Sequence, residues 1–530
     1  MKTKERVICP RCGRIQLVRE KDYANLTFTE ICTSCGFATE GTFFSDSLVT
    51  KKKFEGYGVI SYTNSATLEL EVIPLDNPQS QNAARRDFKE FLNTHAGKYV
   101  EGTPKLTRFD ERTNSLEEYD QDKDQWGRCI PAATNEDGKK RWADDYVIQT
   151  KREEVLLAEI DEMELQSRWI PGVVSRKLRV IPVPSPIEAM GVCVKYNLDP
   201  DQTYENAFSG LKLILNNEGT YYNISDSSRV SLYETAKLFG SSLSKLAPEP
   251  LAQTLNNSLA IAPGTTLLLI RYGKVMAMPS GNYCIMPISE LLNITKRELS
   301  KFGTMTFEEG FTSNTYTAAT WSLPDAQSDL IAKYQDALQA APSRTHAINF
   351  MPMVRLEASD TARRAASLRP LFRMGNGTEF PIGDAISVVH EIRGKGKYGL
   401  DLFEQEAGTV FAKFYESMET MERMAKVEIY NPVNTCVGIF NWLNKASCLI
   451  PRKYADEVRE EIERAAINTP IMSMHDIYLY MAECIGIAKQ SGASLNTRLR
   501  IEEGIAKILT LDWAQFDVGG LVAWGDKKPI

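Results

Sequence analysis

The periodicity of apolar residues changes several times along the chain, and each change predicts a different kind of element. Residues 68–72 alternate leucine or valine with glutamate, a two-residue period typical of a half-buried strand. Residues 153–169 place apolar side chains at helical spacing, which predicts an amphipathic helix. Two apolar runs joined by Tyr272-Gly273 predict a β-hairpin over residues 265–279. Strands and helices are therefore mixed through much of the chain.

The central part of the chain favours an α+β fold, because its predicted strands and helices interleave without the regular order of a parallel βαβ sheet. Helices are expected near residues 187–196, 203–216, 229–246, 288–302 and 325–340, with strands at 347–357 and 385–393. After Gly399 almost every segment has a helical period. The expected helices are 401–426, 432–444, 453–466, 473–489 and 496–510. Short breaks between them predict a helical bundle.

Composition narrows the class of protein. The 530 residues exceed the ~250–300 at which a single core stops growing, so several domains are expected. Hydrophobic residues make up 43% and charged residues 25%, which excludes global disorder. The net charge of −7 excludes a protein whose whole surface coats nucleic acid. No apolar run reaches ~18 residues and no signal peptide is evident, so we expect a cytoplasmic protein without membrane contact.

The strongest motif lies near the N-terminus, where four of the ten cysteines form two Cys-x-x-Cys-Gly motifs. These cysteines are Cys9, Cys12, Cys32 and Cys35. Each motif offers two thiolates from one tight turn, and four thiolates complete the tetrahedral coordination of Zn²⁺. The other cysteines are scattered, as expected in a reducing compartment. Because four protein ligands leave no open position for water, the predicted zinc is structural and not catalytic.

These two motifs resemble the zinc-ribbon superfamily, which occurs in transcription factors, RNA polymerase subunits, primases and topoisomerases. The resemblance covers the first 45 residues. It implies contact with nucleic acid or with a protein complex that works on nucleic acid in transcription or replication. Zinc ribbons also act as protein-docking modules, and this alternative stays open.

Together the patterns predict an α+β protein with a four-cysteine zinc ribbon, a central mixed α/β body and a helical C-terminal region. The expected units are a ribbon at 1–45, a small α+β region at 56–150 that includes an acidic polar insertion at 101–148, a central α+β body at 151–399 and a mostly helical region at 400–530.

Basic residues near the ribbon are candidates for phosphate contact. Arg11 lies inside the first motif and Arg14 follows it, while Lys51, Lys52 and Lys53 come just after the ribbon. Clustered lysines and arginines bind nucleic-acid backbones by neutralising phosphates. A solvated linker accounts for the same charges equally well.

Two further segments carry candidate phosphate ligands. The first contains Arg363, Arg364, Arg369 and Arg373, whose guanidinium groups match phosphate oxygens. The alternative is an ion-paired face opposite acids such as Glu357 and Asp384. The second is the G-x-G-x-x-G pattern at 394–399, in which Lys395 and Lys397 would hold a phosphate, although a solvent loop has the same composition.

Motifs of hydrolytic enzymes are missing from the sequence. The four histidines are isolated from one another, and neither a P-loop nor a G-x-S-x-G motif occurs. We therefore expect a protein that is not an enzyme. A nuclease site made of dispersed carboxylates stays open as an alternative, because its acids would lie far apart in the sequence.

Residues 279–517 resemble uncharacterised proteins of bacteriophages and mobile elements. The resemblance rests on residues 282–287, 359–361 and 431–434. It implies a bacterial host cell or a virion as the setting. The resulting hypothesis is an accessory factor associated with nucleic acid or with a transcription or replication complex. The alternative is a structural or assembly protein, in a virion or an oligomeric scaffold, in which the ribbon is a protein-docking staple.

Overall fold

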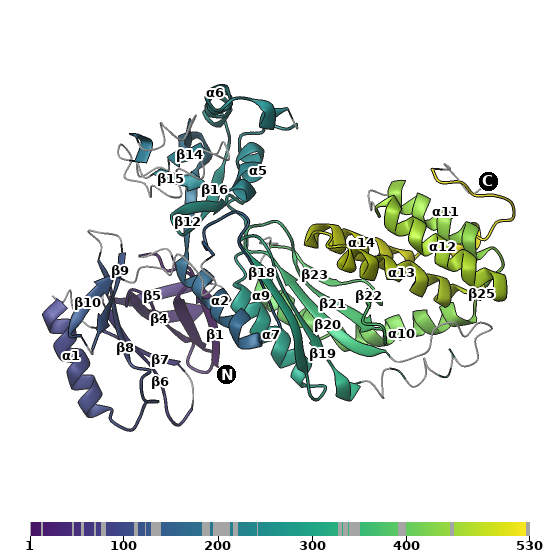
Figure 1. Cartoon of the computed structure of the whole chain (residues 1–530). Helices are drawn as coiled ribbons and strands as arrows, with labels where there is room; N and C mark the ends of the chain where they lie inside the picture. Colours follow the sequence, from purple (N-terminus) through teal and green to yellow (C-terminus); the bar gives the residue numbers. More distant parts are fainter. Residues whose placement is uncertain are drawn as a thin grey trace.

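The structure is a computed structural model of the chain, shown in Figure 1. It describes residues 2–11, 14–44, 47–54, 58–67, 70–75, 81–110, 115–121, 123–128, 139–182, 191–193, 212–215, 221–240, 242–326, 331, 336, 338, 350–390, 399–445 and 450–525. Helices and strands are mixed throughout these ranges, so the predicted α+β class is confirmed.

An antiparallel sheet opens the chain, here called the N-terminal sheet. Its strands, hydrogen-bonded in chain order, are β1 (Lys2–Val7), β2 (Leu17–Asp22), β3 (Thr27–Cys32), β4 (Ala38–Phe44) and β5 (Ser47–Phe54). Its apolar cluster is small, with Leu17 and Phe37 packed around buried cysteines. The cysteines therefore form part of the sheet's interior, together with Phe28 and Phe43, which are also buried.

A second sheet follows, with strand order β10-β9-β8-β6-β7 and the helix α1 (Gln81–Thr94) packed on it. Its strands are β6 (Gly58–Thr63), β7 (Leu70–Pro74), β8 (Lys105–Asp110), β9 (Ser115–Asp120) and β10 (Gln125–Arg128). The predicted strand at 68–72 overlaps β7. The strands β8 to β10 lie within the segment 101–148 that was expected to be a polar insertion, and some of its charges pair across strands. Arg108 and Glu117, for example, lie 2.8 Å apart.

The third sheet, here called the β12–β17 sheet, has the order β12-β16-β17-β15-β14-β13. Its strands are β12 (Ser167–Val174), β13 (Arg179–Pro182), β14 (Lys212–Leu215), β15 (Tyr221–Ile224), β16 (Thr265–Arg271) and β17 (Lys274–Ala277). The helices α5 (Asp226–Thr235) and α6 (Pro248–Leu259) pack on it. The predicted hairpin at 265–279 is confirmed as β16 and β17. The predicted helix at 203–216 is wrong at its end, where β14 is a strand.

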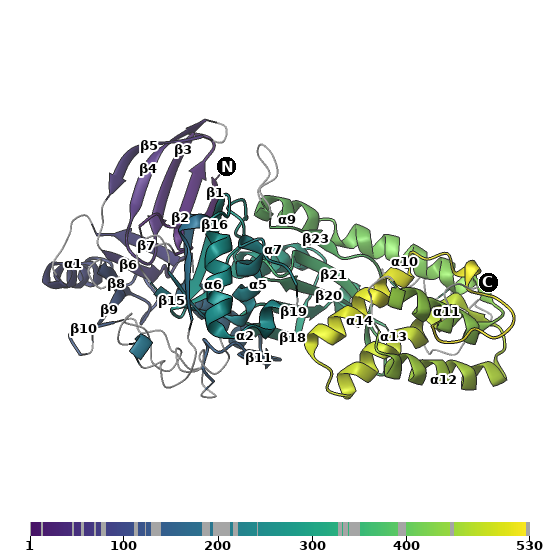
Figure 2. The ribbon, with the colours of Figure 1, turned by 90° about the horizontal axis from the view of Figure 1, so that it is seen from above.

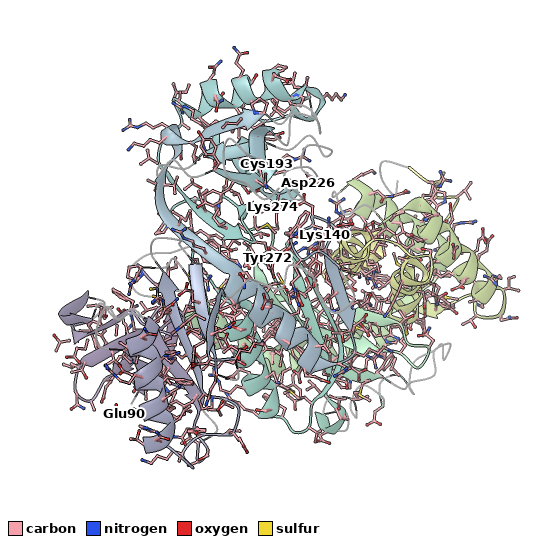
Figure 3. All side chains as sticks on the ribbon, turned by 60° about the vertical axis from the view of Figure 1, so that its left-hand side comes forward. Glu90, Lys140, Cys193, Asp226, Tyr272 and Lys274 are labelled. Atoms are coloured by element: carbon pink, nitrogen blue, oxygen red, sulfur yellow. The ribbon has the colours of Figure 1, made fainter. Side chains whose placement is uncertain are left out.

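A buried ion pair links this sheet to the segment before the strand β11 (Val147–Thr150). Lys274 of β17 is almost fully buried, and its Nζ lies 3.1 Å from Asp144 and donates to the carbonyl of Trp142. Figure 3 shows Lys274 and Tyr272 close together at the base of this sheet. A buried lysine needs such partners, so the pair fixes residues 142–144 against β17.

The large sheet occupies the centre of the molecule (Figure 1). Its strands are β11 (Val147–Thr150), β18 (Thr306–Ser313), β19 (Thr317–Ser322), β20 (Met351–Ala358), β21 (Ala366–Arg373) and β22 (Glu379–Pro381), with β23 (Ile386–Val388) paired to β21. The predicted helices at 153–169 and 288–302 are confirmed as α2 (Glu153–Gln166) and α7 (Ile288–Ser300). The strand β21 was not predicted.

The predicted C-terminal helices are confirmed, with one difference. They are α9 (Gly399–Ala407), α10 (Val410–Lys426), α11 (Pro432–Lys445), α12 (Arg452–Asn468), α13 (Met474–Gln490) and α14 (Leu495–Ile508). The expected single helix at 401–426 is two helices, α9 and α10, which are interrupted at Gly408, a residue with low helix propensity. A short pair of strands, β24 (Glu428–Ile429) and β25 (Met472–Ser473), lies among them.

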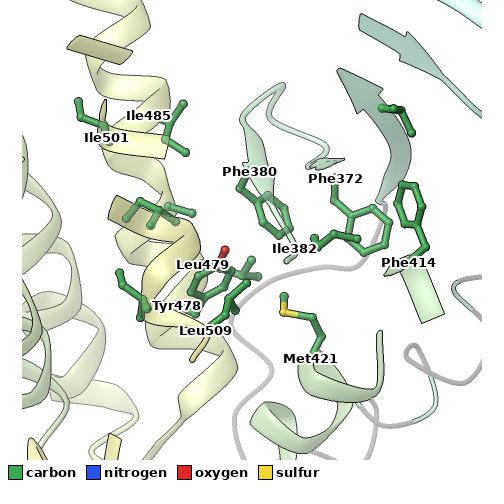
Figure 4. Packing of buried hydrophobic residues seen from close by; sticks show 14 of the residues in the cluster. Phe372, Phe380, Ile382, Phe414, Met421, Tyr478, Leu479, Ile485, Ile501 and Leu509 are labelled. Carbon is green, nitrogen blue, oxygen red and sulfur yellow. The ribbon is translucent and has the colours of Figure 1, made fainter. Parts of the chain in front are cut away.

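These helices share one hydrophobic core with the large sheet. Figure 4 shows Phe372 and Phe380 of the sheet facing Phe414 of α10 and Tyr478 of α13. The core therefore runs across the expected boundary near residue 399. Within the described helices, none has both the length and the apolar composition of a membrane span.

Candidate metal centre

Three of the four predicted zinc ligands meet in the N-terminal sheet. Cys32 ends β3, Cys9 follows β1 and Cys35 lies in the turn before β4. All three are fully buried, and their sulfur atoms lie within 4.8 Å of one another. The sulfurs of Cys9 and Cys35 are 3.5 Å apart. Tetrahedral zinc with Zn–S bonds of ~2.3 Å separates its sulfurs by ~3.8 Å, so the observed spacing fits one shared metal ion.

The two cysteine turns have the same backbone geometry. The amide of Cys9 donates to the carbonyl of Arg14 at 2.8 Å, and the amide of Cys32 donates to that of Phe37 at 2.7 Å. Both bonds join a cysteine to the fifth residue after it. In this register Cys12 corresponds to Cys35. Cys12 itself lies outside the described residues, so the structure brings together three sulfurs of the predicted four.

Residues after the first cysteine turn attach it to the β12–β17 sheet. Arg14 forms an isolated antiparallel bridge with Arg168 of β12. The next residue, Ile15, is buried against Trp169 and Leu269. Figure 2 shows β1 and β2 on the side of the N-terminal sheet that faces β16. The first cysteine turn is therefore part of an interior packing surface.

A salt bridge strengthens the same attachment. Arg6 of β1 lies 3.5 Å from Glu290 of α7 and 3.9 Å from Glu164 of α2. Burial raises the pKa of Glu164, and its carboxylate also accepts hydrogen bonds from the amide and hydroxyl of Ser289. The N-terminal sheet is thus tied to two helices that also pack on the large sheet.

The second cysteine turn contacts the second sheet. Gly36 has a φ of +72°, a left-handed conformation that favours glycine. A Cβ atom at Gly36 would overlap the carbonyl oxygen of Gly58 in β6. That carbonyl accepts a hydrogen bond from the amide of Leu75 at 2.9 Å. The turn therefore fits closely against the backbone of β6.

The predicted basic residues near the ribbon have different positions. Arg11 is half-buried inside the first cysteine turn, and Arg14 makes the bridge to β12. Lys51, Lys52 and Lys53 lie on β5, which is the edge strand of the N-terminal sheet, and their side chains are outside the described part. The structure does not gather these five residues into one described surface.

The arginines of the segment 363–373 are mostly ion-paired. Arg364 lies 3.0 Å from Glu503. Arg369 lies 3.9 Å from Glu357, and Arg373 lies 2.9 Å from Glu308. These contacts correspond to the ion-paired alternative, which named Glu357 as a partner. Arg363 differs, because its side chain is exposed and no carboxylate of the described chain is within ion-pair distance.

The predicted glycine-rich loop lies almost wholly outside the described residues. This part includes Lys395 and Lys397, and only its last residue, Gly399, is described, as the first residue of α9. Packing contacts between the cysteine turns and the neighbouring sheets were not predicted. The contact of Gly36 with Gly58, for example, joins a residue of the second motif to one that lies in no motif, so the sequence showed only the spacing of the cysteines.

Replacing Gly36 with alanine tests the close fit of the second cysteine turn. Gly97 is a matched control, because its φ of +80° is also left-handed but a Cβ there meets no atom within 4 Å. We expect Gly97→Ala to cost about 1 kcal/mol of backbone strain. Gly36→Ala should cost a further 1–3 kcal/mol or so from overpacking against Gly58.

The measurement is native-state hydrogen exchange of peptides that contain Leu75, whose amide bonds to Gly58. Gly36→Ala should lower their protection and Gly97→Ala should not. Equal protection in the two variants would contradict the close contact between the turn and β6.

Comparisons of the chain with protein-family models, curated proteins and solved structures find no match.

Proposed function

We propose that this protein is a structural, assembly-type protein whose N-terminal ribbon is stapled by one zinc ion. The ligands would be Cys9, Cys12, Cys32 and Cys35. One observation supports this proposal above the others: three buried sulfurs converge at the place where the N-terminal sheet touches both the second sheet and the β12–β17 sheet.

The donor set favours zinc. Thiolates are soft ligands that select zinc or iron–sulfur chemistry over magnesium or calcium. Two Cys-x-x-Cys turns with matching backbone hydrogen bonds are typical of structural zinc. Cys12 is proposed as the fourth ligand because it occupies the position in the first cysteine turn that Cys35 occupies in the second. With four sulfurs bound, the ion has no vacant position for a substrate.

The surroundings favour a staple over a freely exposed docking module. Arg14 and Ile15 join the first turn to β12, and Gly36 joins the second turn to β6. The metal would hold the two turns together and thereby fix three sheets relative to one another. The setting we propose is the cytoplasm of a bacterial host cell, or a virion, as the resemblance of residues 279–517 to bacteriophage and mobile-element proteins implies.

Metal analysis of the purified chain tests the staple directly. We expect about one zinc per chain, and we expect Cys32→Ser to lose most of it because a tetrahedral site needs all four ligands. Cys284→Ser is the control, since Cys284 lies outside the cluster and accepts a hydrogen bond from the amide of Gly399, a role that serine can keep. The control should retain its zinc.

Chelation followed by hydrogen exchange separates a staple from a docking module. If zinc is a staple, its removal should raise exchange in β6 and β12 as well as in β1 to β4. Faster exchange confined to β1–β5 would contradict the staple and support an independent docking module. Absence of bound zinc in protein prepared with zinc present would overturn the metal site itself.

A second candidate function is association with nucleic acid through the ribbon. It is favoured by the position of Lys51, Lys52 and Lys53 on the edge strand β5, because clustered lysines neutralise phosphates. Lysines also protect edge strands from aggregation, so this arrangement has a purely structural explanation too.

A mobility-shift assay with single-stranded DNA, duplex DNA and RNA tests this second candidate. Changing the three lysines to glutamine should weaken binding and lower the slope of log affinity against log salt by ~0.7–0.9 per lost phosphate contact. The matched control changes the exposed lysines Lys413, Lys426 and Lys489 to glutamine. No shift by the unaltered protein at low salt, or equal weakening in both triple variants, would rule out this interface.

A further inference from the structure

A cleft of about 780 Å³ lies far from the cysteine cluster in sequence and is formed by residues of several separate segments. One wall comes from α5 and the residues around β16 and β17, and the other from the turn after β20 and the end of β23. Its volume falls in the range of small-molecule sites, ~300–1,000 Å³. Its lining is rich in hydroxyl groups and contains the basic side chains of Lys237, Arg363 and Arg364.

Two of these cations have no carboxylate within ion-pair distance in the described chain. Arg364 is neutralised by Glu503, but neither Arg363 nor Lys237 forms an ion pair there. Glu234 is the one acidic residue among the described residues that line the cleft. An arginine and a lysine facing a largely uncompensated cavity attract an anion, and arginine suits phosphate because its N–H groups form a planar fork.

The turn that carries Arg363 is held rigidly. Asp360 makes an ion pair with the fully buried Arg271. The hydroxyl of Ser359 accepts hydrogen bonds from the amides of Thr361 and Arg363, each at 3.3 Å. Ala362 has a φ of +59°, a left-handed conformation that is costly for alanine. Backbone strain of this kind is retained where surrounding contacts impose it, often at ligand sites.

The orientation of Arg363 follows from this turn. Its Nη2 donates to the carbonyl of Ser227, next to the start of α5 on the opposite wall. This hydrogen bond aims the guanidinium across the cleft and leaves its other N–H groups for a ligand. The cation is therefore fixed in place before any ligand arrives.

His390 supplies a second kind of ligand contact. It is only 7% exposed and stacks on Tyr283 with ring centres 4.9 Å apart. Its Nδ1 lies 3.1 Å from the carbonyl of Cys284, which can only accept, so Nδ1 carries the proton. Burial lowers the pKa of His390 to about 4, which keeps the ring neutral. Nε2 is then a buried acceptor, and no described residue donates to it.

We propose that this cleft binds a small phosphorylated molecule with free hydroxyl groups, of the size of a sugar phosphate or a nucleoside monophosphate. Arg363 and Lys237 would hold the phosphate, and a ligand hydroxyl would donate to Nε2 of His390. Sugar phosphates and nucleoside monophosphates both carry the phosphate and the hydroxyl groups that these contacts need. The site is separate from the metal centre, so either proposal stands if the other fails.

Calorimetric titration of the full chain tests the phosphate contact. The probes are ribose 5-phosphate, AMP and inorganic phosphate. Arg363→Gln should weaken binding of ribose 5-phosphate by about 10- to 100-fold, because a hydrogen bond to a charged group is lost. Arg500→Gln, which changes an exposed arginine of α14 outside the cleft, should stay within about twofold of the unaltered protein.

His390→Phe tests the acceptor, since phenylalanine keeps a flat ring against Tyr283 but cannot accept a hydrogen bond. It should lower the affinity for ribose 5-phosphate toward that for inorganic phosphate and leave phosphate binding unchanged. AMP binding more tightly than ribose 5-phosphate would identify a nucleotide site, and equal affinities a sugar-phosphate site. Failure of both organic probes to bind at millimolar concentration, or unchanged binding in Arg363→Gln, would overturn the proposal.

Discussion

The convergence of buried thiols in the N-terminal sheet is the constraint on which the placement of the first three sheets depends. The apolar cluster of the N-terminal sheet is small, and Cys9, Cys32 and Cys35 form much of it. Phe28 and Phe43 are also buried in this sheet, and a metal ion bound by the three sulfurs would close both cysteine turns at once. The same two turns carry the contacts to β6 and β12. If a metal ion is bound there, its loss would loosen the contacts to β6 and β12 as well as the N-terminal sheet itself.

The rest of the molecule is stabilised differently. The large sheet and the C-terminal helices share an extensive apolar core that includes Phe372, Phe414 and Tyr478. A buried ion-pair network adds to it, with Arg355 of β20 lying 2.6 Å from Glu502 of α14 and 2.8 Å from Glu379 of β22. Removing one member of such a network leaves buried charges uncompensated, so it fixes α14 on the sheet.

Sequence patterns predicted the features that depend on residues close together in the chain. The spacing of Cys9, Cys12, Cys32 and Cys35 predicted a cysteine cluster, and three of these residues do converge, because each turn is set by residues close in sequence. The helices at 432–444 and 473–489 were predicted for the same reason, because the helical period of apolar residues lies within one continuous segment. The structure confirms α11 and α13 at these places.

Features that depend on strand register were not predictable. The strand β14 was assigned to a helix, because a short apolar run such as residues 211–215 does not distinguish the two. Arg369 was a candidate phosphate ligand, yet in β21 it lies beside Glu357 of β20. The cleft near His390 joins segments more than 100 residues apart, so its lining has no sequence signature.

X-ray absorption spectroscopy at the zinc edge of the purified, full-length protein tests the central claim most directly. The account predicts a first shell of four sulfur atoms at ~2.3 Å, which would include the sulfur of Cys12. A shell of nitrogen or oxygen atoms, or fewer than four sulfurs with water completing the coordination, would contradict a closed structural site. Four sulfurs would establish the zinc staple at the joint between the sheets.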